Sequence, residues 1–148
     1  MALCNEHIKV GRGARENWYS ESLDKLAPAD VIFLDPDNGI QTDSVRITQT
    51  RSVKYALDEE ILGYARNCEL VIVYNHRDHS PDVEYLQKFR RVHHRLGRST
   101  SMRLLRFKRV SARDYVFFFT PRTASIVNRL VNILTTAPFD FMFEETGG

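Results

Sequence analysis

The sequence predicts an α/β protein: a three-layer sandwich with parallel central strands and an antiparallel edge pair. Short apolar runs typical of buried strands occur at residues 31–34, 70–74 and 115–119. Longer segments with helical spacing of apolar residues alternate with them. The first two runs end abruptly in polar clusters, and in sheets of this kind the ligand-binding crevice lies outside the carboxyl ends of the strands. The same pattern therefore predicts both a fold and the place of a site.

Length and composition are those of one ordinary globular domain covering residues 1–148. The chain is 43% hydrophobic and 27% charged, and at this size a single core can form. No apolar run is long enough to span a membrane, and the N-terminal residues do not form a signal peptide. Cys4 and Cys68 make neither a disulfide framework nor a metal-ligand pair. We expect a cytoplasmic protein with no membrane partner and no catalytic thiol.

The predicted elements follow the order αβαβαββα. A Pro-containing break ends the first helix at residue 26, and Gly97 ends the third. The last helix follows Thr120-Pro121 and is expected to turn Ile126, Val127, Leu130 and Leu134 inward. In addition to this last helix, we expect helices at residues 14–26, 53–66 and 81–96. We expect strands at residues 31–34, 70–74, 102–107 and 115–120.

The two polar clusters are the candidate site. Asp35, Asp37 and Asn38 follow the first strand, where the two carboxylates suit a general base or a divalent cation, although Asp-Pro and Asn-Gly are also common turn dipeptides. In the second cluster His76 suits general acid/base chemistry. We expect catalytic roles for Asp35, Asp37 and His76, and substrate contacts from Asn38, Lys54, Asn75 and Arg77.

Charge is divided unevenly along the chain. Residues 1–87 carry a net charge of −6 and residues 88–148 a net charge of +8, with no acidic residue between 88 and 113. Such a block either pairs with the acidic front half or faces a polyanion such as nucleic acid. On the second alternative the nucleic-acid contacts would come from Lys88, Arg91, Arg95, Arg106, Lys108 and Arg109.

The run Val31–Asn38 resembles the fourth motif of class I S-adenosylmethionine-dependent methyltransferases that act on amino groups. Asp35 and Pro36 match the motif, whereas Asp37 replaces its second proline and Asn38 replaces its aromatic residue. The resemblance implies a Rossmann-like, methyltransferase-like topology that corresponds to the second half of such a domain. It also implies that Asp35 and the following carbonyl hold an exocyclic amine. A glycine-rich cofactor motif is absent from the sequence.

A second resemblance, to a group of prokaryotic and phage proteins of unassigned function, covers most of the chain. It is carried by the LDPDNG run at 34–39 together with Lys54-Tyr55, Glu59-Glu60 and residues 71–76, and it extends to residues 104–107 and 137–139. It brings no activity with it. It implies that the two strand ends, Lys54 and the acidic start of the second helix belong to one site.

Three functions remain open from the sequence. The first is a methyltransferase-like enzyme acting on nucleic acid or a nucleotide, with S-adenosylmethionine as cofactor. The second is a phosphohydrolase or nuclease that holds Mg²⁺ through Asp35, Asp37 and Glu59 or Glu60. The third is a non-catalytic module that binds nucleic acid or protein. The aromatic tail (Phe139, Phe141, Phe143) is either an edge strand packed on its own core, which we favour, or a homodimer contact.

Overall fold

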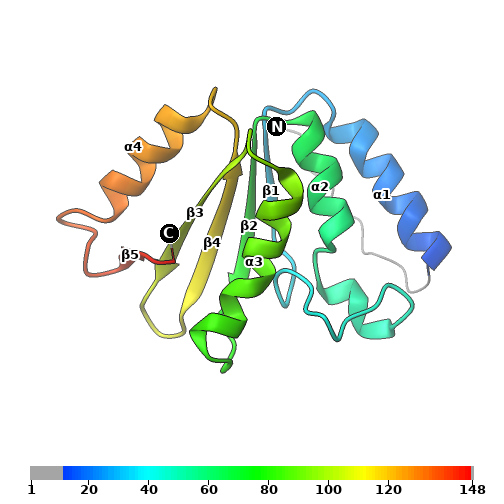
Figure 1. The fold of residues 1–148 in the computed structure, drawn as a ribbon, viewed down its shortest axis with the longest axis horizontal. Coiled ribbons are helices and arrows are strands. Elements are labelled where there is room, and N and C mark those ends of the chain that lie inside the picture. Colours follow the sequence, from blue (N-terminus) through cyan, green and yellow to red (C-terminus); the bar gives the residue numbers. More distant parts are fainter. Residues whose placement is uncertain (1–11, 148) are drawn as a thin grey trace.

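A computed structural model describes residues 12–147, which form one mixed sheet between two helical layers (Figure 1). Three helices cover one face of the sheet and a fourth lies on the other, so the expected three-layer α/β arrangement is confirmed. Among the described residues no helix is both long and apolar enough to cross a membrane. The elements are α1 (Arg12–Leu26), β1 (Val31–Leu34), a 3-10 helix (Thr50–Lys54), α2 (Asp58–Asn67), β2 (Leu70–His76), α3 (Asp82–Leu96), β3 (Ser101–Phe107), β4 (Arg113–Phe119), α4 (Ala124–Leu134) and β5 (Phe143–Glu145).

The strand order, β1-β2-β4-β3-β5, differs from the expectation of a parallel centre. Only β1 and β2 are parallel, with Val31 beside Leu70, and they lie at one edge of the sheet. Every other neighbouring pair is antiparallel. The physical reason is burial: β4 is apolar on both faces and takes the centre, whereas β3 carries Arg103 and Arg106 and lies nearer the other edge.

The larger core lies between the sheet and α1, α2 and α3. Alternate strand residues point into it, among them Ile32 of β1, Val71 and Val73 of β2, and Phe118 of β4. Helix α2 begins at residue 58 rather than 53, because residues 50–54 form the separate 3-10 helix. The Glu60 carboxylate accepts a hydrogen bond from the Leu57 backbone N–H (2.9 Å) and so satisfies a free donor at this helix start.

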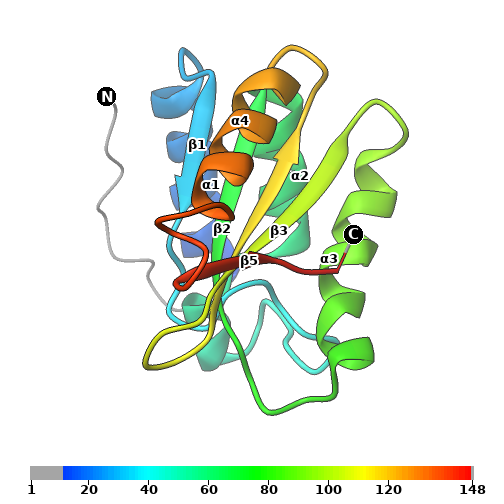
Figure 2. The same ribbon diagram turned by 90° about the vertical axis from the view of Figure 1, so that its left-hand side faces the viewer.

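The opposite face of the sheet is only partly covered. Val127 and Val131 of α4 pack there against Leu105, Phe117 and other residues of the central strands. The sequence expectation for α4 was wrong at two positions, because Ile126 and Leu130 are exposed. Apolar residues occupy about half of the circumference of this helix, and its own sheet covers only part of that half. Figure 2 looks onto this face: α4 crosses in front of the sheet, and β1 lies to its side.

The aromatic tail supplies the fifth strand. Phe143 of β5 pairs with Phe107 of β3, and their rings lie 5.3 Å apart between centroids. The expected edge strand is therefore present, although only Phe143 packs on the core. Phe139 and Phe141, which precede β5, are exposed.

Candidate functional site

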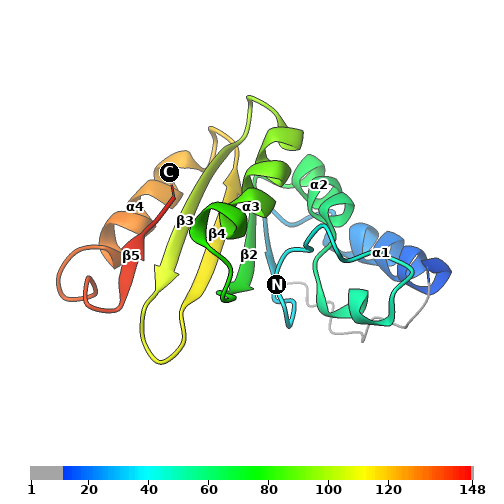
Figure 3. The ribbon, with the colours of Figure 1, turned by 60° about the horizontal axis from the view of Figure 1, so that its bottom comes forward.

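A depression of about 520 Å³ lies on the open face of the sheet at the carboxyl ends of β1 and β2. The structure thus brings Asp35, Asp37 and His76 together, as the placement of the two polar clusters predicted. Figure 3 views the molecule from this end and shows the loops that follow the two strands. The lining residues are Phe33, Asp35, Pro36, Asp37, Tyr74, His76, Arg113 and Tyr115, referred to below as the aromatic depression.

Aromatic side chains form much of this surface, and the sequence reasoning missed them. Phe33, Tyr74 and Tyr115 come from three neighbouring strands and point to the same face, since Phe33 is aligned with Ile72 and Tyr74 with Tyr115. The two tyrosine rings lie 5.6 Å apart, and the His76 ring lies 5.0 Å from Tyr74. The signal that could have identified them is the alternation of side chains within each strand. The apolar runs of these strands predict burial on both faces of the sheet, whereas one face is open at this end.

Arg113 is the cation of the aromatic depression. Its Nε atom is buried and has no hydrogen-bond partner among the described residues. Burial raises the pKa of the Tyr74 hydroxyl. The positive charge of Arg113 opposes this effect and the negative charge of Asp35 adds to it, so both charged residues lie near enough to influence Tyr74. An arginine with a buried, unpartnered N–H beside open aromatic rings has donor capacity left for an anionic or carbonyl-bearing ligand.

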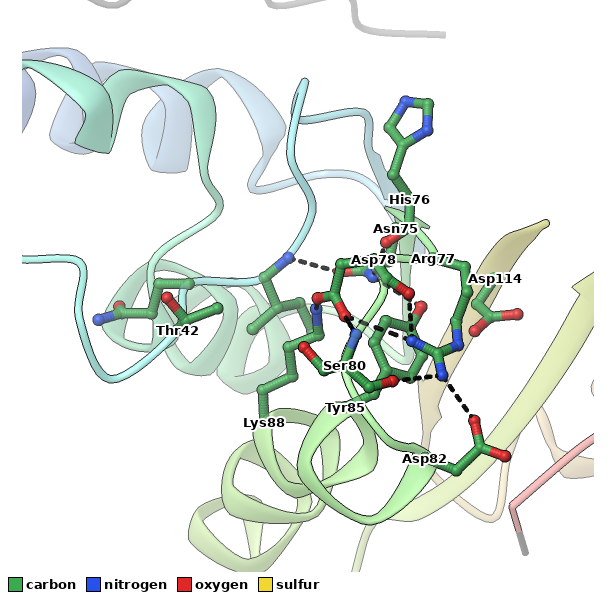
Figure 4. A network of polar contacts seen from close by, with 12 residues as sticks. Thr42, Asn75, His76, Arg77, Asp78, Ser80, Asp82, Tyr85, Lys88 and Asp114 are labelled. Atoms are coloured by element: carbon green, nitrogen blue, oxygen red, sulfur yellow. Dashed lines mark hydrogen bonds and ion pairs between the residues drawn. The ribbon is translucent and has the colours of Figure 1, made fainter. Parts of the chain in front are cut away.

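Asn75 does not face this depression, which corrects its expected substrate contact. Its side chain is fully buried on the other face of the sheet, toward α3 (Figure 4). The Oδ1 atom accepts a hydrogen bond from the Ile40 backbone N–H (2.8 Å), and Nδ2 donates to the His76 carbonyl (2.9 Å) and the Tyr85 hydroxyl (2.8 Å). Asn75 therefore ties the loop after β1 to β2 and α3.

Arg77 and Lys88 also belong to this internal polar network. Arg77 donates to the Ser80 carbonyl (2.6 Å) and to Asp82 (2.8 Å), and Lys88 lies 3.5 Å from Asp78. Both cations sit 4.3 Å from the centre of the Tyr85 ring. Burial lowers the pKa of the Lys88 ammonium group, and the neighbouring Asp78 carboxylate opposes that effect. In Figure 4 the His76 ring points away from the network.

The basic block does not form a continuous unpaired surface. Arg91 binds Asp58 through two nitrogens (2.6 and 3.1 Å), and Arg95 pairs with Glu59 (2.5 Å). Arg106 likewise binds Asp114 through two nitrogens. The other residues expected to contact nucleic acid are also engaged: Lys88 with Asp78, Lys108 with Glu144 (3.8 Å), and Arg109 over the Phe141 ring (5.1 Å).

The three carboxylates expected to hold Mg²⁺ are not assembled. Asp35 and Asp37 line the aromatic depression, whereas Glu59 lines a second cavity on the helical side of the molecule and pairs with Arg95. The described residues include no group of three His, Cys, Asp or Glu side chains placed to hold a metal ion. Lys54 adjoins the loop through its backbone, since its carbonyl accepts the Asn38 N–H (2.8 Å), and neither residue lines the depression.

The second cavity, of about 570 Å³, lies among α1, α2 and the 41–47 loop. A buried ion pair forms one part of its wall: Arg15 binds Glu60 (2.5 and 2.8 Å) and the carbonyls of Ser52 and Tyr55. Because the hydrogen bonds of Arg15 and Glu60 are satisfied within the protein, this pair supports the structure of α1 and α2.

The cysteines offer no reactive group among the described residues. Cys68 is buried away from both cavities, and burial raises the pKa of its thiol to about 11, which disfavours the nucleophilic thiolate. Cys4 lies outside the described residues.

Comparisons with models of known protein families, with curated proteins and with solved structures find no match.

Proposed function

We propose that the protein binds a nucleotide or a short single-stranded segment of nucleic acid on the open face of its sheet. The observation that carries this proposal is the combination of three aromatic rings with Arg113, whose Nε has no described partner, in one depression. Bases stack on aromatic side chains regardless of sequence, and a guanidinium group binds a phosphate oxygen.

The acidic residues of the depression suit the edge of a base rather than its phosphate. Asp35 and Asp37 are acceptors, and nucleobases present N–H donors on their edges. The His76 imidazole borders the same surface and supplies a group able to exchange a proton. The acceptors follow β1 and the cation belongs to β4, with β2 and its Tyr74 ring between them. This division favours an unpaired base, because the bases of a duplex are already stacked and paired.

Methyl transfer is the catalytic extension that the resemblance implies. In its favour, Asp35 lies at the end of β1 and within the depression, where an amine-anchoring carboxylate would be needed. S-adenosylmethionine would require its own cavity beside the depression, but the second cavity lies on the helical side of the sheet. Neither of the two cavities described above supplies a place for a methyl donor next to the substrate, so we propose binding alone and derive no transfer step.

The test is fluorescence anisotropy of a labelled single-stranded oligonucleotide, with a duplex of the same sequence as comparison. Phe33→Ala is expected to weaken binding by about 1–3 kcal/mol, or roughly 5- to 150-fold in Kd. Phe141→Ala is the matched control, because Phe141 is 55% exposed and Phe33 53% exposed, yet Phe141 lies outside the depression. Circular dichroism of both variants checks that the fold is intact.

Two results would overturn the proposal: no binding of single strands at any concentration, or equal losses from Phe33→Ala and Phe141→Ala. Calorimetric titrations with mononucleotides and with S-adenosylmethionine determine the ligand class. Binding of mononucleotides would identify the base and its phosphate as sufficient. Mononucleotide binding that Phe33→Ala does not weaken would contradict the assignment of the depression, and binding of S-adenosylmethionine would return methyl transfer to consideration.

A further inference from the structure

The two carboxylates of the aromatic depression are free to receive a ligand. Asp35 and Asp37 are exposed, and neither carboxylate forms a hydrogen bond or ion pair with another described residue. The buried Asp114 of β4, by contrast, is bound by Arg106 through two nitrogens. An ionised carboxylate offers two acceptor oxygens in one plane and no donor, so it favours a ligand that presents two adjacent N–H donors.

The edges of the common bases differ in whether they present such a pair of donors. Guanine carries its N1–H beside the N2 amino group, so the two donors point the same way. Adenine and cytosine each place an amino group beside an unprotonated ring nitrogen, whose lone pair would face a carboxylate oxygen. Uracil and thymine place one N–H between two carbonyl oxygens. Among these bases, guanine alone gives a carboxylate two hydrogen bonds without a repulsive neighbour.

The width of the depression favours a purine nucleotide that lies across the strands. The carboxylates follow β1, the Tyr74 ring belongs to β2 and Arg113 begins β4, and these strands are neighbours in the order β1-β2-β4. Neighbouring strands are about 4.8 Å apart, so roughly 10 Å separates the acidic side of the depression from its cation. The two fused rings of a purine hold its donor edge farther from the sugar and phosphate than the single ring of a pyrimidine does. A purine can therefore stack over Tyr74 with its edge at β1 and its phosphate at β4.

We propose that the aromatic depression selects guanine. This inference rests on the proposed function and names the base that binds there. The N1–H and the N2 amino group donate to the oxygens of Asp35 or Asp37, and Arg113 binds the phosphate. His76 is exposed beside the same surface, points away from the internal polar network (Figure 4), and its ring nitrogens form no hydrogen bond with a described residue. A ring N–H of His76 is thus available to the guanine O6 atom.

Fluorescence anisotropy with thymidine oligonucleotides that carry one central guanine, adenine, cytosine or hypoxanthine tests the selection. We expect the guanine strand to bind about 5- to 150-fold more tightly than the adenine and cytosine strands, which is the discrimination that one bidentate contact provides. Hypoxanthine keeps the N1–H and the O6 of guanine but lacks the amino group. Its strand should therefore bind with an affinity between those of the guanine and adenine strands.

Replacement of each carboxylate by an amide gives a change of preference that a loss of structure would not give. An Asn side chain presents one acceptor and one donor, which match the amino group and the ring nitrogen of adenine. Asp35→Asn or Asp37→Asn, according to which carboxylate receives the base, should weaken guanine binding and strengthen adenine binding. Asp30→Asn is the matched control, because Asp30 is exposed and precedes β1 at the opposite end of the strand. It should leave the preference unchanged.

Equal affinities for the guanine and adenine strands would overturn the selection of guanine and leave the proposed function standing. A preference for adenine or cytosine would also overturn it, as would hypoxanthine that binds as tightly as guanine. A guanine preference that neither Asp35→Asn nor Asp37→Asn reduces would overturn the assignment to the depression. Absence of binding by every strand contradicts the proposed function itself, so the two failures give different results.

Discussion

Gly39 lies so close to the Asn75 side chain that any side chain at residue 39 would collide with the Asn75 amide group. A Cβ atom on Gly39 would lie 1.9 Å from the Asn75 Oδ1 atom, which also accepts the Ile40 N–H. Gly39 has a φ of +81°, in the left-handed region that favours glycine. The side-chain amide of Asn75, on β2, therefore fixes the position of the loop that follows β1.

Gly39→Ala should destabilise the protein strongly. The new methyl group meets Asn75, and the positive φ adds about 1 kcal/mol of backbone strain. We expect a total loss of about 2–4 kcal/mol in the free energy of unfolding. Urea denaturation followed by circular dichroism measures it. Gly97→Ala is the matched control, because Gly97 has a φ of +84° but nothing lies within 4 Å of its Cβ position.

A double-mutant cycle with Asn75→Ala separates the collision from the strain. Asn75→Ala alone removes three internal hydrogen bonds. In the double variant the collision disappears as well, so the loss should be smaller than the sum of the single losses. Additive losses would contradict the contact between residues 39 and 75.

Glu60→Ala should cost about 3–5 kcal/mol of stability, because it leaves the buried Arg15 guanidinium without its carboxylate. Glu59→Ala, at the adjacent position, removes only an exposed partner of Arg95 and should cost less than about 1 kcal/mol. Thermal and urea denaturation of the two variants make the comparison. Equal losses would contradict a structural role for the Arg15–Glu60 pair.

The Arg103–Glu145 pair should contribute to stability only above acidic pH. Hydrogen bonds from Arg103 hold the pKa of the Glu145 carboxyl below its usual value of 4.5. The stabilising contribution is therefore complete above the unfolded value and is lost as the pH falls through the lower folded value. Glu145→Gln should be less stable than the wild type at pH near 7, by up to about 1 kcal/mol, and the gap should close in acid. Urea denaturation across this pH range measures the gap, and a gap independent of pH would contradict the assignment.

Arg113→Ala should reduce the salt dependence of single-strand binding as well as its strength. Each phosphate contact contributes about 0.7 to the slope of log K against log salt concentration on a single strand, so loss of one contact lowers the slope by that amount. Arg91→Ala and Arg95→Ala are the controls, because both guanidinium groups already pair with carboxylates of α2. If those two variants lower the slope and Arg113→Ala does not, the basic block rather than the depression contacts the phosphates.

The elements could be read from the sequence because apolar periodicity is a local property. Residues 31–34 are a strand as expected, and the polar residues Asp35 and His76 lie at the same end of the sheet. The order of strands was not predicted, since β3 and β4 pair locally and either could adjoin β2; only the more continuous apolarity of β4, against Arg103 and Arg106 in β3, bears on the choice. That choice depends on the total burial of each strand within the assembled sheet.

The candidate site was predictable in position but not in composition. The open face depends on where α4 packs, and α4 has apolar residues on two sides, so the inward side of the helix could not be chosen from spacing alone. For this reason the sequence predicts core positions for Phe33 and Tyr115, whereas both line the depression. Similarly, the pairing of Arg91 with Asp58 joins positions far apart in the chain, which a local charge count does not detect.

The insertion of β4 between β2 and β3 has a consequence for the order in which the sheet can assemble. The β3–β4 hairpin closes a short loop, whereas the pairing of β1 with β2 joins segments separated by an entire helix. Strands β1 and β5 each have one neighbour and pair through only four and three residues, so these two edge strands add the fewest hydrogen bonds to the sheet. We expect native-state hydrogen exchange to find the hairpin most protected and the edge strands β1 and β5 least. The floor of the aromatic depression would then open first at Phe33, without unfolding of the central strands.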